Sequence, residues 1–214
     1  MASDTEREPL TRDRVVVVAL RLLDEDGLEK LTLRRIAKEL DVQAPALYWH
    51  VANKRALLDY LTDAMVAGGL AGLRGRKADE QWWQWLHRAA ALLRRGLLKH
   101  QDGARVAAGA DLSRAAALAT WLDQTVTVLT DAGFDLHDAV LSAGSLMSFV
   151  IGRTAEEQSL PDGKTLRDLQ DRVRLKAVAR GLATTDRRQS ADARARQAVG
   201  IFITGLRTIL RESQ

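Results

Sequence analysis

Apolar residues recur every three to four positions along most of the chain, which is the spacing of one face of an α-helix. The first such stretch covers residues 12–26, where Thr11 can cap the start and Gly27 can end the helix. The valine run at 15–18 favours a buried strand by propensity alone, but the apolar positions keep helical spacing through the whole stretch. Only three prolines interrupt the chain. The pattern predicts an all-helical protein.

Two short helices follow, joined by a tight turn. Thr32 begins the first of them, and Asp41 ends it because aspartate tolerates the left-handed backbone that a tight turn needs. Pro45 suits the first turn of the second helix, where its missing N–H has no helical partner, and this helix is expected to reach about His50. Ala37 is small enough to let the two helices cross closely. The combination predicts a helix-turn-helix.

Beyond it, Asn53 caps a helix that is expected to reach about Ala67. The glycine-rich stretch 68–75 is interpreted as a hinge, because no strand precedes it and no Gly-Lys-Ser/Thr follows to make a phosphate loop. It divides the chain into an N-terminal domain, 1–67, and a larger C-terminal domain, 68–214. Further helical segments are predicted at 80–100, 103–109, 113–132, 136–158, 164–181 and 191–211.

Composition excludes several classes of protein. The absence of cysteine removes disulfides, thiolate metal sites and cysteine nucleophiles. The longest uncharged stretch, 139–152, has 14 residues and is too short to cross a bilayer. The acidic, polar N-terminus has neither the basic start nor the apolar core of a signal peptide. We therefore expect a cytoplasmic protein without a membrane partner.

The formal net charge of +4 is unevenly placed. Residues 1–61 hold 10 Lys/Arg against 11 Asp/Glu, a net of −1, so the remaining residues carry 22 against 17, a net of +5. A local positive face is nevertheless expected within 32–56, where the acids Glu39 and Asp41 are outnumbered. Its basic residues are Arg34, Arg35, Lys38, Lys54 and Arg55.

A family resemblance is carried by the helix-turn-helix and the helix after it, in LTLRRIAKELDV at 31–42, PALYWHV at 45–51 and NKRALLD at 53–59. These runs resemble the DNA-binding domain of the TetR family, and in particular its tetracycline repressors. The similarity continues into the second half of the chain, in the segments 97–106, 132–136 and 156–158.

The resemblance implies a homodimeric repressor that binds a palindromic operator in double-stranded DNA and is released by a small-molecule effector. Dimerisation is expected through the helices near 136–158 and 191–211, whose small residues permit close approach; packing within one subunit is the alternative. A transcriptional activator or an effector-independent DNA-binding protein is the alternative function. The scattered histidines and the lack of a nucleophile motif predict no catalysis, and we expect no cofactor.

Candidate DNA contacts come from placing the second short helix in the major groove. Ala44 and Ala46 stand where tetracycline repressors carry a glutamine and a threonine that read bases, so we expect a different operator. These residues could instead have no contact with DNA. In that case Arg34 and Lys54 are ordinary solvated charges, His50 is a structural histidine, and Trp49 packs beneath the helix. The full candidate set is Thr32, Arg34, Gln43, Ala44, Pro45, Ala46, Tyr48, Trp49, His50 and Lys54.

The expected effector site differs from that of tetracycline repressors. Leu70, Ala89, Leu93 and Ala107 replace drug-binding polar or aromatic groups of those proteins, the magnesium-ligating histidine among them. A glutamate persists at 156 or 157, but a lone acid holds a divalent ion poorly, so we expect no metal and reject tetracycline-magnesium. The site candidates are Leu70, Trp85, Ala89, Leu93, Val106, Ala107, Trp121 and Met147.

Further apolar residues that suit such a pocket are Trp82, Trp83, Leu86 and Phe149. Together they predict a site for a hydrophobic or aromatic effector. The alternative is that these aromatic side chains only fill the core.

Overall fold

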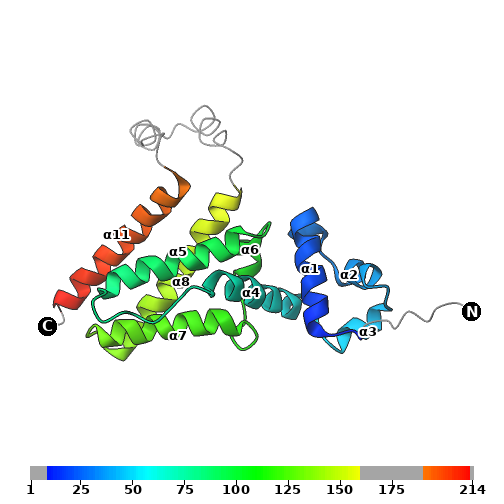
Figure 1. Cartoon of the computed structure of the whole chain (residues 1–214), viewed down its shortest axis with the longest axis horizontal. Coiled ribbons are helices and arrows are strands. Elements are labelled where there is room, and N and C mark those ends of the chain that lie inside the picture. The colour runs from blue at the N-terminus through cyan, green and yellow to red at the C-terminus, as the bar shows by residue number, and fades with distance from the viewer. Residues whose placement is uncertain (1–8, 160–189, 213–214) are drawn as a thin grey trace, which may run out of the picture.

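The computed structural model describes residues 9–159 and 190–212. Within these residues every regular element is a helix, and turns and loops join the helices. Figure 1 shows the N-terminal helices gathered at one end of α4 (Lys54–Leu70), while the remaining helices pack around its other end. The predicted all-α class is confirmed. The helix predicted at 164–181 lies outside the described residues.

The N-terminal head consists of α1 (Arg12–Asp26), the 3₁₀ turn η1 (Leu28–Lys30), α2 (Leu33–Glu39) and α3 (Ala44–Tyr48). Thr11 caps α1 by accepting a hydrogen bond from the Arg14 N–H, and Gly27 ends it at φ 78°. The valine run is helical because its apolar spacing buries one face of α1 in the core of the head, which the strand alternative would not do.

The helix-turn-helix forms as its sequence predicts. The Thr32 hydroxyl caps α2 by accepting from the Arg35 N–H, and Asp41 takes a left-handed conformation at φ 52°. The Val42 N–H donates to the Ala37 carbonyl and closes the turn. Pro45 occupies the first turn of α3. This helix ends at Tyr48, earlier than the predicted end near His50.

Helix α4 (Lys54–Leu70) begins at the predicted Asn53 cap but ends three residues later than predicted. Gly68, Gly69 and Leu70 are helical, so the hinge interpretation is wrong for these three positions. A Cβ at Gly69 would lie 2.6 Å from the Cα of Gly96, so the glycine lets α4 and α5 (Trp82–Leu98) cross in close contact. This tight crossing offsets the low helix propensity of glycine, which costs about 1 kcal/mol.

The C-terminal part contains α5 (Trp82–Leu98), α6 (Gly103–Ala107), α7 (Ala116–Asp131), α8 (Leu136–Ser159) and α11 (Ala191–Glu212). Their apolar faces form one core, while α1 to α3 and the first turns of α4 form a second core. Helix α4 contributes to both. None of the described helices combines the length and the apolar character that crossing a membrane requires.

Candidate DNA-binding and effector sites

Helix α3 presents its polar and aromatic side chains outward from a buried anchor. Leu47 is fully buried in the core of the head, which fixes the helix in place. Gln43, Pro45 and Tyr48 are exposed, and Ala44 and Ala46 are half-buried between them. The exposed side chains have the placement that contact with DNA would require.

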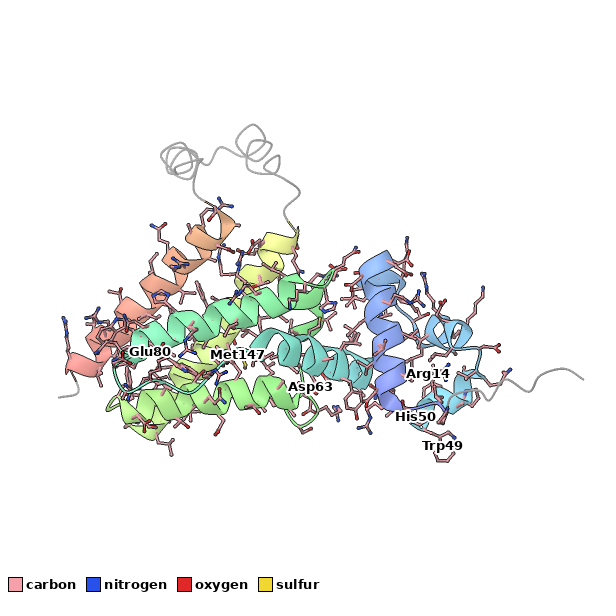
Figure 2. All side chains as sticks on the ribbon, viewed as in Figure 1. Arg14, Trp49, His50, Asp63, Glu80 and Met147 are labelled. Atoms are coloured by element: carbon pink, nitrogen blue, oxygen red, sulfur yellow. The ribbon has the colours of Figure 1, made fainter. Side chains whose placement is uncertain are left out.

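Trp49 follows α3 and is 89 % exposed. Figure 2 shows its ring projecting past the ribbon of the head, next to His50. The alternative that Trp49 packs beneath the helix is therefore wrong for this structure. With Tyr48, which is 55 % exposed, it forms a pair of neighbouring aromatic residues on the surface at the end of α3.

The positive face predicted within residues 32–56 has fewer available charges than the sequence suggests. Arg35 forms an ion pair with Asp26, and Arg55 pairs with Asp59, so these two charges are neutralised within the protein. Arg34 and Lys38 are exposed, and no ion pair of theirs is found among the described residues. Lys54 is exposed as well, and its Nζ lies 3.5 Å from the Leu28 carbonyl oxygen. Arg34, Lys38 and Lys54 are thus the exposed cations of the predicted positive face.

The head is tied to the C-terminal domain by polar contacts at the end of α1. Asp24 accepts hydrogen bonds from the Gln101 N–H at 3.0 Å and pairs with the imidazole Nδ1 of His100 at 3.0 Å. The Asp102 carboxylate accepts from the Leu28 N–H at 2.9 Å and leaves α6 without a side-chain cap. Polar groups of the turn between α5 and α6, namely His100, the Gln101 N–H and Asp102, therefore bind the head.

A second junction forms around Asp59 of α4, which is fully buried. Its carboxylate pairs with Arg55 at 2.7 Å and Arg114 at 2.9 Å and accepts from the Asp111 N–H at 3.1 Å. Burial by itself raises the pKa of Asp59, but the hydrogen bonds from Arg114, Asp111 and Arg55 outweigh it and hold the pKa below its ordinary value. Asp59 therefore fastens α4 to the segment before α7.

Sequence reasoning did not identify Asp59. Its one local signal is an acid placed among the apolar positions of a helix, between Leu58 and Tyr60. The positions of Asp111 and Arg114, more than fifty residues away, are set by the fold.

The predicted effector residues are mostly brought together in the C-terminal core. Trp85 and Trp121 are fully buried, and their indole N–H groups donate to the carbonyls of Arg74 at 2.9 Å and Ala89 at 3.1 Å. Leu93 and Ala107 are buried in the same cluster, with Leu70 and Met147 half-buried at its border. The arrangement is apolar, and the two indole donors already have partners.

Val106 is the exception among these candidates. It is buried with the core of the head, among residues of α1 to α4, and is absent from the cluster that holds the tryptophans. The side chain sits on α6, which packs against α4 on one side and α8 on the other, so adjacent residues of this helix face different cores.

The two glutamates considered as metal ligands are engaged with arginines. Glu157 forms two hydrogen bonds with Arg94, at 2.6 and 2.8 Å, and Glu156 pairs with Arg153. Within the described residues, no three His, Asp or Glu side chains gather where they could hold a metal ion. The carboxylates near the end of α8 thus serve as ion-pair partners.

Comparison with known protein families matches both parts of the chain. Residues 15–61 match the model described as bacterial regulatory proteins, tetR family, and residues 75–211 match the tetracyclin repressor-like C-terminal domain. Among curated proteins, the tetracycline repressor protein class C of Escherichia coli is 41 % identical over 150 residues, which cover 70 % of this chain and 67 % of that protein.

Solved structures give the same result. ActR of Streptomyces coelicolor, in complex with (S)-DNPA, superposes with a TM-score of 0.80 at 27 % identity and covers 97 % of this chain and 100 % of its own. BioQ of Mycobacterium smegmatis has a TM-score of 0.70 at 31 % identity and covers 92 % and 98 %. A BioQ structure with its double-stranded DNA operator has a TM-score of 0.63 at 32 % identity and covers 82 % and 99 %.

Proposed function

Because this chain belongs to the TetR family of DNA-binding transcriptional regulators, which are not enzymes, we propose that it is a homodimeric repressor released by a small apolar effector. Residues 1–67 form its DNA-binding domain and residues 68–214 its effector-binding and dimerisation domain. The observation that carries the proposal is the exposure of Tyr48 and Trp49 at the end of α3, together with the exposed cations Arg34, Lys38 and Lys54 on the neighbouring helices.

The operator is expected to differ from the tetracycline operator. Ala44 and Ala46 offer methyl groups, which can contact the methyl of thymine but form no bidentate hydrogen bond with a purine. Gln43 is exposed and retains the amide that can read adenine. Arg34, Thr32, Lys54 and His50 complete the DNA contacts in this proposal, and Pro45 sets the approach of the helix.

Dimerisation is proposed through the outer faces of α8 and α11. Large apolar side chains stand exposed on both helices, and a Cβ added at Gly144, Gly152 or Gly205 would meet no atom within 4 Å in this subunit. Apolar surface of this kind on neighbouring helices is stabilised when a second copy covers it. The exposed residues are Leu136, Val140, Leu141, Ile201 and Ile209.

The effector is proposed to enter among Trp85, Ala89, Leu93, Ala107 and Trp121. Their apolar character, together with the engagement of Glu156 and Glu157 by arginines, supports an uncharged hydrophobic or aromatic molecule without a metal. The curated relative's name refers to tetracycline, but Leu70, Ala89, Leu93 and Ala107 stand where the family resemblance places drug-binding groups, and they offer no polar side chain.

A second candidate function is supported by the same core. Trp85 and Trp121 are fully buried with their indole donors satisfied, as expected of a filled core that needs no ligand. This favours an effector-independent DNA-binding protein, and an activator role would follow from operator position alone.

One experiment separates these functions: footprinting of the purified protein on the DNA flanking its own gene, repeated with a panel of uncharged aromatic and aliphatic compounds. We expect two protected half-sites about one helical turn apart, lost on adding an effector. The matched control is Trp49→Ala, which should fold and need about tenfold more protein to give the same protection. Protection that no compound relieves would support the effector-independent alternative, and a strong preference for the tetracycline operator over random DNA would contradict the proposed base readers.

A further inference from the structure

The loop 71–81 joins the end of α4 to the start of α5, and in Figure 1 it leads to the end of α5 that lies away from the head. It contains the rest of the predicted hinge, 71–75. Leu73 and Glu80 are half-buried in this loop, whereas its other residues are exposed. Leu73 packs against the core cluster that holds Trp85. The loop therefore touches the cluster in which the effector site is proposed.

The backbone of this loop satisfies the indole N–H of Trp85. Trp85 is fully buried, and its Nε1–H donates to the Arg74 carbonyl oxygen at 2.9 Å. Trp121 is equally buried, but its indole donates to the Ala89 carbonyl oxygen of α5 at 3.1 Å. Each buried N–H needs such a partner, and the two partners belong to different kinds of segment. The partner of Trp121 belongs to a packed helix, whereas the partner of Trp85 belongs to an exposed loop.

Arg88 of α5 fastens the loop at two points. It follows Trp85 by three residues and therefore shares one face of the helix with it. Arg88 Nη1 donates to the Arg74 carbonyl oxygen at 3.1 Å, so this oxygen accepts from both side chains. Arg88 Nη2 pairs with the Glu80 carboxylate at 2.7 Å, and Arg88 Nε donates to it at 3.1 Å. The two side chains are 31 % and 15 % exposed, which leaves the pair partly shielded from salt and water.

The rest of the loop is weakly packed. Glycines stand on either side of the Leu73–Arg74 pair, and a Cβ added at Gly72 or Gly75 would meet no atom within 4 Å among the described residues. Close packing therefore does not require these glycines, and they increase the conformational freedom of the backbone. Segments with few buried apolar contacts open at a lower free energy than packed helices do. Opening of this loop removes Leu73 from the core and breaks the hydrogen bonds to Arg74 and Glu80, while the helices stay packed.

We propose that the loop 71–81 is a strap that opens while the helices stay packed, and that Arg88 is the positioning residue that keeps it closed. The open strap gives access to Trp85 and the cluster beneath it, so this inference rests on the effector site proposed above. Opening frees the Trp85 N–H from the Arg74 carbonyl. An effector that enters here is therefore bound most tightly when it carries one hydrogen-bond acceptor beside its apolar surface.

The test is hydrogen exchange of the two indole N–H groups, followed by NMR on the ligand-free, full-length protein at low urea concentrations. The Trp85→Phe and Trp121→Phe variants assign the signals. In the parent, the Trp85 N–H should exchange at least about tenfold faster than the Trp121 N–H. Its rate should hardly change with urea, because opening of a loop exposes little surface. Exchange at Trp121 should accelerate with urea, because it requires disruption of packed helices.

Variants separate the strap from the rest of the fold. Arg88→Gln should accelerate exchange at Trp85 by about tenfold or more, because hydrogen bonds to a carbonyl and a carboxylate are lost. The matched control is Arg95→Gln, two turns later on the same face of α5, which removes an exposed guanidinium that donates within its own helix and should leave the rate unchanged. Asp59→Asn weakens the α4 junction away from the strap, so it should accelerate exchange at Trp121 and leave Trp85 within about twofold.

Access for a ligand is measured by stopped-flow mixing with N-phenyl-1-naphthylamine, an uncharged aromatic dye that fluoresces in apolar surroundings. The binding rate should rise in Arg88→Gln in the same proportion as exchange at Trp85, because both follow the fraction of molecules with an open strap. If the dye binds neither protein while exchange at Trp85 is fast, the strap is supported and the effector site beneath it is contradicted, so the two proposals fail separately.

Three results would overturn the strap. The first is exchange at Trp85 that depends on urea as steeply as exchange at Trp121, which would mean that the loop opens only when the fold does. The second is an unchanged rate of exchange at Trp85 in Arg88→Gln. The third is a dye that binds the parent and Arg88→Gln at the same rate, which would place the route of entry elsewhere.

Discussion

Removal of the Asp59 carboxylate is expected to weaken the junction between α4 and the segment before α7. The side chain is fully buried and takes part in contacts with Arg55, Arg114 and the Asp111 N–H. Hydrogen bonds to charged groups contribute about 1.5–3 kcal/mol each, and part of this is regained in the variant because the two arginines are 41 % and 37 % exposed and can be hydrated. We therefore expect Asp59→Ala to lower the free energy of unfolding by about 3 kcal/mol.

The assay is equilibrium urea unfolding followed by tryptophan fluorescence, with thermal unfolding as a second measurement. For a chain of this size, about 3 kcal/mol corresponds to a fall in Tm of about 6–12 °C. Asp59→Asn should lose less, about 1–2 kcal/mol, because its amide oxygen still accepts from the Asp111 N–H. The control is Glu25→Gln, which breaks an exposed pair with Arg21 and should cost less than about 0.5 kcal/mol. A loss below about 0.5 kcal/mol in Asp59→Ala would refute the role given to this junction.

Three further predictions test other parts of the structure. Because the folded pKa of Asp59 is lowered, its stabilising effect is complete above the unfolded pKa of about 3.9 and is lost as the pH falls through the folded pKa. Urea titrations of the parent and Asp59→Ala should therefore differ equally at pH 6 and 8, and the difference should begin to shrink below about pH 4. Gly68→Ala should stabilise the protein by about 0.5–1 kcal/mol in urea unfolding, since its Cβ meets nothing within 4 Å, whereas Gly69→Ala should destabilise it by about 1–3 kcal/mol because its Cβ meets the Gly96 backbone; equal effects would contradict the tight crossing. Trp49→Ala should change stability by less than about 0.5 kcal/mol and weaken operator binding by about tenfold in a mobility-shift assay, and unchanged binding would remove Trp49 from the interface.

Local chemistry made the head predictable from sequence. The caps at Thr11, Thr32 and Asn53 each bond to an N–H three residues ahead, so the signal and its partner lie within one short window. The left-handed turn at Asp41 is similarly local. These contacts depend on few other residues, and the structure has each of them where the sequence predicts it.

The end of α4 was not predictable in the same way. Glycine propensity argues for a break at Gly68, and nothing near it in sequence argues otherwise. The helix continues because Gly96, on the following helix, requires a partner without a side chain at position 69. The same limit applies to Asp59, whose partners Asp111 and Arg114 lie on a distant segment. In both cases the decisive contact joins residues whose proximity exists only after folding.

The effector candidates show a different kind of limit. Sequence correctly placed Trp85, Leu93 and Trp121 together in one apolar cluster, and burial alone gives the same pattern for a ligand pocket and for a filled core. A ligand pocket differs from a filled core in the free energy needed to separate the side chains of the cluster. An effector must compensate for separating side chains whose indole donors are already bonded to the carbonyls of Arg74 and Ala89. An effector that breaks these two hydrogen bonds must supply acceptors for both indole N–H groups. An effector that leaves them in place must bind through apolar contacts alone. The candidate ligands are accordingly flat hydrophobic molecules, in which a carbonyl or ether oxygen strengthens binding only if an indole turns toward it.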